Sequence, residues 1–391
     1  MTHIDVVVVG GGYAGVTAAN RLTQRGDMNV TLINARPRFV ERIRLHQLVG
    51  GSDDAVVEYR DVLAERIRLV VDSVTGIDAA ERNVTLASGA VIAYDYLIYA
   101  AGSGSAHPQV PGAAQFAYPI ASLEQAERLR SALDAAPSAA AVTVVGAGPS
   151  GIETAAELAE AGRAVTLICG GVLGPYLHPR GRRSVANRLA RLGVTMVDGP
   201  DSVVTGVTSD AVQLVVGRKL PSVVTIWTAG FGVPDLAARS GLSTDAVGRL
   251  LTDETLTSVD DTRIVAAGDS ASPSGLPFRM SCQAAGPLGW HAADTVLARI
   301  AGEQPTHVCM LFFGQCISLG RRGGIFQFAR KNDKPVGFYI GGRAGAVLKE
   351  FVCRGTVKQL SIEARKPGLL RVPGWAGDHS RRELLRAKVD V

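Results

Sequence analysis

The sequence has few of the features that mark secreted or membrane-spanning proteins. Its 391 residues include five cysteines, and none of these form a Cys-x-x-Cys pair. We therefore expect neither a disulfide framework nor a zinc ribbon, but reduced thiols in a cytoplasmic protein. No run of about 18 apolar residues occurs, so no spanning helix is expected. The N-terminus passes directly into Val6–Val9 without a basic segment, which argues against a signal peptide.

Charge of one sign is in excess only near the C-terminus. Between Arg343 and Val391, eleven Lys or Arg stand against five Asp or Glu, although the formal net charge of the whole chain is only +5. An acidic partner, an anionic lipid surface or nucleic acid would all be attracted to such a segment, and a solvated basic face is the simpler alternative. The length and the 47% hydrophobic content indicate a globular chain of two or three domains.

Two stretches of the chain repeat the same order of elements. The first begins with an apolar strand over Ile4–Val9, followed by a Gly-rich loop, a helix over Val16–Arg25 and a strand over Val30–Ile33. The pattern over residues 66–93 predicts a β-meander. A last apolar strand ends at Ala101-Gly102.

The second copy contains the same parts in the same order. A strand is expected over Ala141–Val145, then a Gly-rich loop, a helix over Ile152–Ala161 and a strand over Val165–Ile168. Further strands are expected over 194–224, and the copy ends at Ala229-Gly230.

The two Gly-rich loops predict nucleotide binding. They read Gly10-x-Gly12-x-x-Gly15 and Gly146-x-Gly148-x-x-Gly151, each between an expected strand and an expected helix. In such loops the first glycine permits a tight turn, the second lets a pyrophosphate approach the backbone, and the third lets the helix pack closely. The helix N-terminus then offers free N–H groups to the phosphates. We expect two dinucleotide sites, and the alternative is two Gly-rich turns with only structural duties.

A short apolar strand that ends in Gly268-Asp269 completes a set of five motifs, together with the two Gly-rich loops and the two Ala-Gly strand ends. Their order, over about residues 4–300, resembles the FAD-dependent pyridine nucleotide-disulfide oxidoreductase superfamily. The resemblance implies an α/β fold with two Rossmann-like nucleotide-binding domains and a C-terminal α+β domain. It implies a discontinuous FAD-binding domain (1–115 and 250–300), an NAD(P)H-binding domain (116–249) and a C-terminal acceptor or interface domain (301–391).

Within this superfamily the chain resembles the type II NADH dehydrogenases and the apoptosis-inducing-factor-like flavoproteins. The segment Phe39–Gly51, where disulfide reductases place their redox pair, contains no cysteine. The segment Ser281–Ala285 partly resembles the Gln-containing helix start that type II NADH dehydrogenases place beside the flavin and the quinone, but their second Gln is missing here. The resemblance implies an enzyme that takes hydride from NADH or NADPH to FAD and passes electrons to a quinone-type acceptor.

The resemblance also assigns site residues, motif by motif. Glu153 and Gln283 are the expected catalytic residues, and for Glu153 the alternative is a carboxylate placed early in a helix by the helix dipole. Asp269 is expected to hold the ribitol of the flavin. No metal ligands are expected. The residues expected to contact FAD or the nicotinamide nucleotide are Gly10, Gly12, Tyr13, Ala14, Gly15, Asn34, Arg36, Arg44, Gln47, Val74, Ala101, Gly102, Gly146, Gly148, Pro149, Ser150, Gly151, Cys169, Ala229, Gly230, Gly268, Asp269, Gln283 and Ala284.

Two positions depart from the usual pattern of a ribose-binding acid. Asn34 and Cys169 stand where an acidic residue normally binds the ribose hydroxyls in the first and second copies. An amide still hydrogen-bonds to a hydroxyl, so FAD binding is retained, with Arg36 as support. Arginines at 180, 182 and 183 follow Cys169, and the choice between NADH and NADPH stays open. His46 is either a structural residue or a proton donor.

The acceptor and the location are less constrained by the sequence. The alternatives to a quinone are a small iron–sulfur electron-transfer protein, or no acceptor at all in a non-catalytic nicotinamide-binding flavoprotein. Spaced apolar residues between Arg343 and Lys358 suit either a membrane-surface helix or a helix packed on its own domain. We expect no nucleic acid partner. A homodimer and a peripheral contact with the inner face of the plasma membrane are both compatible with this cytoplasmic protein.

Overall fold

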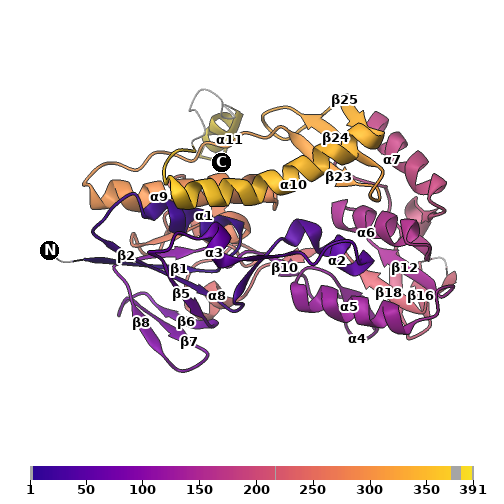
Figure 1. The fold of residues 1–391 in the computed structure, drawn as a ribbon, viewed down its shortest axis with the longest axis horizontal. Coiled ribbons are helices and arrows are strands. Elements are labelled where there is room, and N and C mark those ends of the chain that lie inside the picture. Colours follow the sequence, from indigo (N-terminus) through magenta and orange to yellow (C-terminus); the bar gives the residue numbers. More distant parts are fainter. Residues whose placement is uncertain (1–2, 216, 371–379, 390–391) are drawn as a thin grey trace.

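Two parallel sheets, one from each copy of the repeat, organise the chain (Figure 1). The computed structural model describes residues 3–215, 217–370 and 380–389, so the remaining residues of the expected domains lie outside the described part. The first sheet has the order β21-β9-β1-β2-β5 and the second β11-β18-β12-β13-β14, with all neighbours parallel. Their strands are β1 (Ile4–Val9), β2 (Met28–Asn34), β5 (Arg68–Val71), β9 (Tyr96–Tyr99) and β21 (Ile264–Ala266), and β11 (Ala117–Pro119), β12 (Ala141–Val145), β13 (Ala164–Ile168), β14 (Thr195–Val197) and β18 (Val224–Trp227).

The inner strands are apolar on both faces because both faces of each sheet are covered. Val6 to Val9 of β1 are all buried. Helices α1 (Tyr13–Leu22) and α9 (Cys282–Ile300) cover one face of the first sheet and pack on each other. Helix α1 begins at Tyr13 rather than at the expected Val16, because the end of the glycine loop is already helical. The expected α/β class with two Rossmann-like units is confirmed.

Each parallel sheet carries an antiparallel meander. The first consists of β6 (Val74–Asp78), β7 (Asn83–Leu86) and β8 (Val91–Ala93), and the second of β15 (Val204–Val207), β16 (Ala211–Leu214) and β17 (Lys219–Pro221). The expectation that residues 66–93 form one meander is wrong at its start. Strand β5 pairs in parallel with β2, because it returns from the helical segment before it to extend the main sheet.

The chain crosses between the two units at β10 (Gly104–Ser105) and β19 (Phe231–Gly232), which pair with each other. After β19, helix α8 (Leu236–Arg239) packs on β6, and Leu236 and Ala237 lie in one cluster with Leu97 of β9. The expected domain boundary at 249 stays a prediction, and these contacts favour a return to the first unit at β19.

The last part of the described chain is α+β. Strands β23 (Gly314–Ser318), β24 (Gly324–Ala329) and β25 (Pro335–Gly341) form an antiparallel sheet, and helix α10 (Gly342–Arg365) follows. Figure 1 shows α10, in yellow, running from this sheet beside the second unit to α1 of the first unit. No helix among the described residues is both long and apolar enough to cross a membrane.

Shorter elements connect these layers. Helices α2 and α5 lie side by side where the two units meet, and α2 also packs on α6. The remaining elements are β3 (Arg38–Val40), η1 (Arg42–Arg44), α2 (Leu45–Gly50), β4 (Val56–Glu58), α3 (Tyr59–Val62), α4 (Ala113–Phe116), α5 (Leu123–Ala135), α6 (Pro149–Glu160), α7 (Pro179–Arg191), η2 (Pro200–Ser202), β20 (Leu250–Thr252), η3 (Gly268–Ser270), β22 (Ala271–Pro273) and α11 (Ser380–Val389).

A buried arginine joins two helices of the first unit to helix α10 of the C-terminal part. The guanidinium of Arg21, on α1, makes two hydrogen bonds to the carboxylate of Asp294 on α9, at 2.6 and 2.8 Å. It also donates to Oε1 of Glu363 on α10, at 3.2 Å. Arg21 and Glu363 are almost fully buried, so each charge depends on its partner.

Replacement Arg21→Met should lower the free energy of unfolding by about 3–5 kcal/mol, because it leaves Glu363 buried without its partner. The matched control is Arg25→Met, which breaks the solvent-screened pair with Asp27 and should leave the free energy of unfolding nearly unchanged. Urea unfolding followed by circular dichroism measures both. Equal effects of the two substitutions would show that the Arg21 cluster does not join the helices as described.

Candidate functional site

The two Gly-rich loops have the same geometry, and each leaves one glycine open. A Cβ on Gly15 would lie 1.8 Å from the carbonyl oxygen of Gly10, and a Cβ on Gly151 would lie 1.8 Å from that of Gly146. The third glycine of each loop therefore permits close packing of the helix. A Cβ on the second glycine, Gly12 or Gly148, would meet nothing within 4 Å. The open space lies where a nucleotide pyrophosphate needs to approach the backbone.

The helices that follow the loops begin without side-chain caps. Gly12 and Gly148 are the N-cap residues of α1 and α6, and neither helix has a side-chain cap hydrogen bond from the described residues. Neither first turn contains an acidic residue. Free N–H groups and the positive end of the helix dipole are therefore available to an anion. Tyr13, Ala14, Pro149 and Ser150, all expected to contact the cofactors, lie in these first turns. The two loops fit FAD and a nicotinamide nucleotide.

Asp269 lies in a polar group at the ends of the first-sheet strands. The hydroxyl of Ser103 donates to Oδ2 of Asp269 at 2.6 Å. Arg42 donates to Oγ of Ser103 at 3.1 Å, and its Nη1 lies 3.8 Å from the same carboxylate oxygen. These contacts use Oδ2, and no hydrogen bond from another described residue reaches Oδ1, so Oδ1 could accept from a ligand hydroxyl, as expected for a residue that holds the ribitol. Gly102 and Gly268 precede these residues directly.

Glu153 lies at the meeting point of the second unit, the first unit and the C-terminal segment. Its Oε1 accepts from the backbone N–H of Ser318 on β23 at 2.9 Å, and Nζ of Lys349 on α10 lies 2.9 Å away. Nδ1 of His46, on α2, lies 3.6 Å from Oε2. Glu153, Lys349 and His46 are all more than nine-tenths buried. Because Glu153 lies beyond the first turn of α6, the helix dipole does not explain its position.

The charges in this cluster follow from burial and pairing. Burial favours the neutral form of Glu153, but Lys349 and His46 outweigh this effect and lower the pKa of Glu153. Burial likewise opposes the charge of Lys349, and Glu153 outweighs it, so the pKa of Lys349 is raised. Burial lowers the pKa of His46 to about 4, against the opposing effect of Glu153. At neutral pH the cluster therefore holds a carboxylate, an ammonium and a neutral imidazole.

Arg44 makes hydrogen bonds to protein partners, and Gln47 accepts one of them through Oε1, although its buried Nε2 has no hydrogen-bond partner among the described residues. Arg44 donates to both carboxylate oxygens of Glu350 on α10, at 2.9 and 3.1 Å, and to Glu41 at 3.2 Å. It also donates to Oε1 of the fully buried Gln47 at 2.9 Å. Their expected contact with a cofactor stays a prediction, and the geometry favours a structural role in which Arg44 ties α10 to the first unit.

Gln283 and Ala284 lie in the first turn of α9. With its amide oriented to satisfy both groups, Gln283 donates to the carbonyl of Gly314 at 3.0 Å and accepts from the N–H of Phe313 at 2.9 Å. The N–H of Ala284 bonds to the capping hydroxyl of Ser281. These bonds tie α9 to the start of β23, and the catalytic role expected for Gln283 stays a prediction.

Asn34 and Cys169, which replace the usual ribose-binding acids, have different surroundings in the structure. Asn34 accepts from the N–H of Gly11 at 3.0 Å and donates to the carbonyl of Arg36 at 2.9 Å, so it shapes the first loop from within. Arg36 pairs with Glu124 on α5 of the second unit. Cys169 follows β13 and is buried, and burial raises the pKa of its thiol to about 11, so it offers no charge to a ribose.

The other expected contacts lie at strand ends. Val74 begins β6, Ala101 follows β9, and Ala229 and Gly230 follow β18. Ala229 also accepts, through its carbonyl, from the indole N–H of Trp227.

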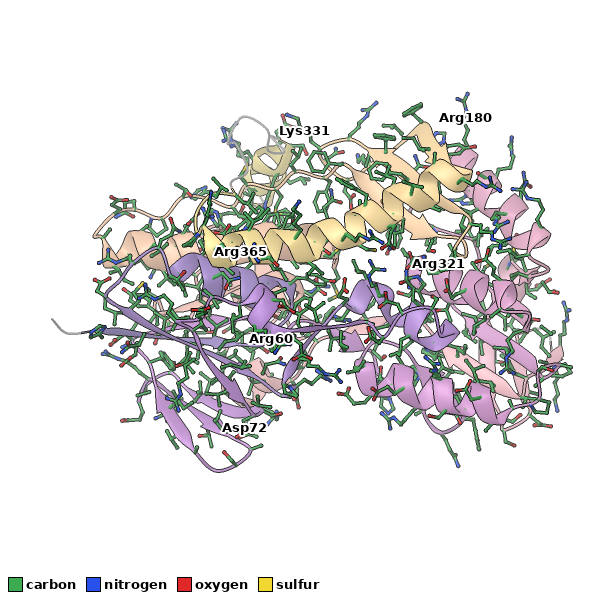
Figure 2. The ribbon with its side chains drawn as sticks, in the orientation of Figure 1. Arg60, Asp72, Arg180, Arg321, Lys331 and Arg365 are labelled. Atoms are coloured by element: carbon green, nitrogen blue, oxygen red, sulfur yellow. The ribbon has the colours of Figure 1, made fainter. Side chains whose placement is uncertain are left out.

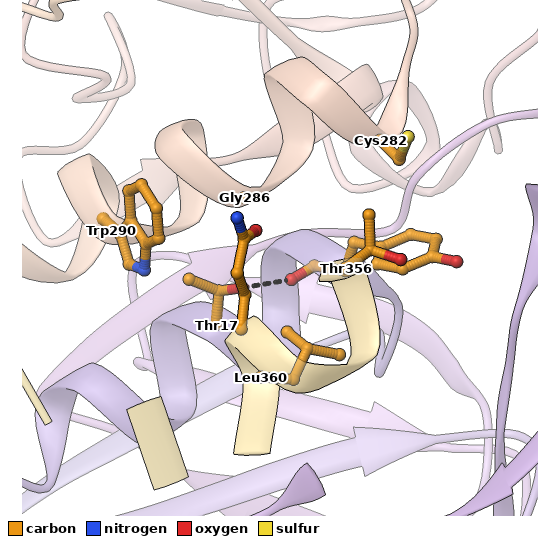
Figure 3. A pocket seen from close by; sticks show the side chains of 8 residues that line it. Thr17, Cys282, Gly286, Trp290, Thr356 and Leu360 are labelled. Atoms are coloured by element: carbon orange, nitrogen blue, oxygen red, sulfur yellow. Dashed lines mark hydrogen bonds between the residues drawn. The ribbon is translucent and has the colours of Figure 1, made fainter. Parts of the chain in front are cut away.

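A small cavity lies between α1, α9 and α10 (Figure 3). Its volume is about 10 Å³, room for about one water molecule. The hydroxyl of Tyr13 and the indole nitrogen of Trp290 are buried there without a hydrogen-bond partner among the described residues. Thr17, Cys282 and Thr356 also line it, and Figure 3 shows Thr17 bonded to the Tyr13 backbone. The cavity is too small for an electron acceptor.

Sequence reasoning missed Lys349, Arg42 and Ser103. For Lys349 a signal exists, because it lies four residues from Gly345 and four from Cys353 on the buried face of α10. A single charge on the buried face of an amphipathic helix requires a partner. Arg42 and Ser103 carry no comparable signal, since only the fold brings them to Asp269. Among the described residues no cluster suited to a metal ion occurs.

Comparison with known proteins gives the same assignment as the motifs. A family model described as pyridine nucleotide-disulphide oxidoreductase matches residues 4–293. The chain is 29% identical over 353 residues to an NADH dehydrogenase-like protein of Mycobacterium tuberculosis, covering 82% of this chain and 87% of that protein. It is 28% identical over 346 residues to the type II NADH:quinone oxidoreductase Ndh of the same organism, covering 77% and 73%.

Two solved structures show the same fold. The sulfide:quinone oxidoreductase of Aquifex aeolicus superposes with a TM-score of 0.78 at 20% identity, over 99% of this chain and 96% of that one. NDH2 of Plasmodium falciparum in complex with NADH gives a TM-score of 0.76 at 16% identity, over 95% and 100%. The resemblance drawn from the five motifs is confirmed, and the chain belongs to the pyridine nucleotide-disulphide oxidoreductase family.

Proposed function

We propose that the protein is an FAD-dependent NAD(P)H dehydrogenase that passes electrons to a quinone-type acceptor. The observation that carries the proposal is the pair of open glycines, Gly12 and Gly148, each at the start of an uncapped helix. The second of these helices also carries Glu153, which pairs with the buried Lys349 of α10. The named relatives, an NADH dehydrogenase-like protein and an NADH:quinone oxidoreductase, support the donor and the acceptor class.

The chain's own residues bind, orient and manage protons. The first loop and α1 would hold the FAD pyrophosphate, and Asp269 would hold its ribitol. The second loop and α6 would hold the nicotinamide nucleotide, NADH or NADPH. When bound, FAD supplies the chemistry of accepting hydride and passing electrons on. Lys349 is buried and keeps its proton at Nζ. A quinone takes up protons when it becomes a quinol, and Lys349 would hold one of them for this step.

Replacement Gly12→Val should yield protein without flavin absorbance, because the side chain fills the space that the pyrophosphate needs. Replacement Gly148→Val should keep the flavin but lose its reduction by NADH and NADPH in stopped-flow absorbance. The backbone at both positions is extended, so valine itself causes no strain. The control is Gly26→Val, at another exposed glycine with nothing within 4 Å of a Cβ, which should change neither property. Normal flavin reduction in Gly148→Val would contradict the assignment of the loops.

Replacement Glu153→Gln should lower quinone turnover by about 10²-fold, because the carboxylate that keeps Lys349 charged is lost. Lys349→Met should also destabilise the fold by about 3–5 kcal/mol, because it leaves Glu153 buried alone. The double variant should regain stability in urea unfolding but not turnover with NADH and a soluble quinone. Recovery of turnover in the double variant would show that the Glu153–Lys349 pair has only a structural role.

We further propose that the exposed face of α10 contacts a membrane surface that contains anionic lipid. Val347 and Phe351 are each 71% exposed on this face, and Arg343, Arg354 and Lys358 flank them. Apolar side chains framed by basic ones suit an interfacial helix. Such a contact would deliver a lipid-soluble quinone to the protein. The expected homodimer stays a prediction.

The double variant Val347→Ser/Phe351→Ser should weaken binding to vesicles of phosphatidylglycerol and phosphatidylcholine by about tenfold or more, because two apolar side chains no longer enter the lipid. High salt should weaken wild-type binding as well. The control is Val71→Ser/Val91→Ser, which removes two exposed valines in the first unit away from α10. Co-sedimentation measures each case, and equal loss in both double variants would contradict a contact through α10.

A further inference from the structure

Helices α2 and α6 pack with their turns in register. His46 of α2 faces Glu153 of α6, with Nδ1 3.6 Å from Oε2. One turn later, Gly50 of α2 faces Glu157 of α6, and a Cβ on Gly50 would lie 2.4 Å from Cγ of Glu157. Residues four apart share one helix face, so the two pairs form one continuous seam. The absence of a side chain at Gly50 makes room for Glu157.

Two polar atoms in this seam have no hydrogen-bond partner among the described residues. They are Nε2 of His46 and Oε2 of Glu157, and both residues are 4% exposed. Buried polar atoms in proteins are normally paired with protein or with ordered water. The two facing pairs lie one helical turn apart, so an ordered water between them would satisfy both atoms.

The outer end of the seam reaches solvent. The exposed Ser52 donates its hydroxyl to Oε1 of Glu157 at 2.5 Å. Nε of Arg321 lies 3.7 Å from Oε2 of Glu157, and the Arg321 side chain is 37% exposed. Figure 2 labels Arg321 beside α6 and the end of α2. Glu157 is therefore the last buried acid before bulk water, and Glu153 with Lys349 forms the inner end.

The charges around the seam suit proton transfer. Burial raises the pKa of Glu157, with Glu160 and Glu153 adding to the effect and Ser52 and Arg321 opposing it. Burial keeps His46 neutral, and the positive charges of Lys349, Arg321 and Arg44 reinforce this against Glu153. A neutral imidazole with its proton on Nδ1, the nitrogen 3.6 Å from Oε2 of Glu153, presents Nε2 as an acceptor. The raised pKa of Glu157 increases the fraction of this acid that carries a proton, and that form is the matching donor.

The proposed reaction requires such an entry for protons. Hydride from NADH carries two electrons and one proton, whereas a quinone that becomes a quinol takes up two electrons and two protons. One proton per turnover must therefore come from water. We propose that it travels from Ser52 through Glu157 and His46 to the Glu153–Lys349 pair. This inference rests on the proposed function and adds three residues, Ser52, Glu157 and His46, to its proton supply.

The first experiment separates the two half-reactions. In Glu157→Gln, stopped-flow reduction of the bound flavin by NADH should match wild type, while reoxidation by a soluble quinone should slow by about tenfold. The rate of wild-type reoxidation should fall as the pH rises through the pKa of Glu157, because the acid then loses its proton. The Glu157→Gln variant should not show this decrease. Added imidazole buffer should restore part of the rate, which a merely structural change would not allow.

The matched control is Glu160→Gln, which removes the next carboxylate of the same helix. Glu160 pairs with Arg188 and accepts from the backbone N–H of Arg321, but it makes no hydrogen bond to Ser52, Glu157 or His46. Reoxidation should therefore keep its wild-type rate, and only its pH dependence should move slightly to lower pH, because a negative charge that raises the pKa of Glu157 is lost. If Glu157→Gln does not fold, Ser52→Ala keeps the acid in place and should slow reoxidation by a smaller factor with the same imidazole rescue. Normal reoxidation with a wild-type pH profile in either seam variant would overturn the pathway.

A second measurement does not depend on turnover. In protein labelled with ¹⁵N-histidine, the Nε2 resonance of His46, assigned by its loss in His46→Phe, should shift in Glu157→Gln and stay unchanged in Glu160→Gln. An unshifted resonance in Glu157→Gln would show that the seam is not connected. If wild-type flavin is not reduced by NADH or NADPH, or not reoxidised by quinone, the proposed function fails instead, whatever the resonance shows.

Discussion

The neutralisation of Glu153 by Lys349 is the interaction on which the arrangement of the whole site depends. A carboxylate and an ammonium that are both buried are stable only while they remain together, because either one alone carries a large desolvation cost. Glu153 belongs to the helix of the second loop, Lys349 to α10, and the Ser318 N–H that completes the pair to β23. The C-terminal segment is thereby held at a fixed position over the second unit.

Helix α10 binds the two nucleotide-binding units through neighbouring residues. Lys349 pairs with Glu153 of the second unit, and Glu350 pairs with Arg44 of the first. Successive helix residues project about 100° apart, so one turn of α10 reaches both units. Four turns later Glu363 pairs with Arg21 of α1. A motion that separates the units would have to break ion pairs at low dielectric, which explains why the cluster at Glu153 can be both dry and ordered.

The sequence predicts well those features that depend on local pattern. Strands Ile4–Val9 and Ala141–Val145 have the expected bounds, because continuous apolar runs before Gly-rich loops leave little choice of structure. Strand β5 was misplaced because its few residues carry no signal for parallel rather than antiparallel pairing. Arg44 was expected near a cofactor, yet its partner Glu350 lies about 300 residues away in the chain. Partners at such separation become visible only when the chain is folded.

The two copies of the repeat share one loop geometry, but the helices that follow the loops have different roles. Each copy places a residue two and six positions after its third glycine on the same face of the helix, Thr17 and Arg21 in the first copy and Glu153 and Glu157 in the second. Both faces meet α10, but with opposite charge: Arg21 pairs with Glu363, and Glu153 pairs with Lys349. The glycine loops keep their common geometry because pyrophosphate binding demands it, while the next turn is free to diverge. In the first copy this part of the helix supplies Arg21, which holds α10 in place. In the second copy it supplies Glu153 and Glu157, the acids that we propose transfer protons.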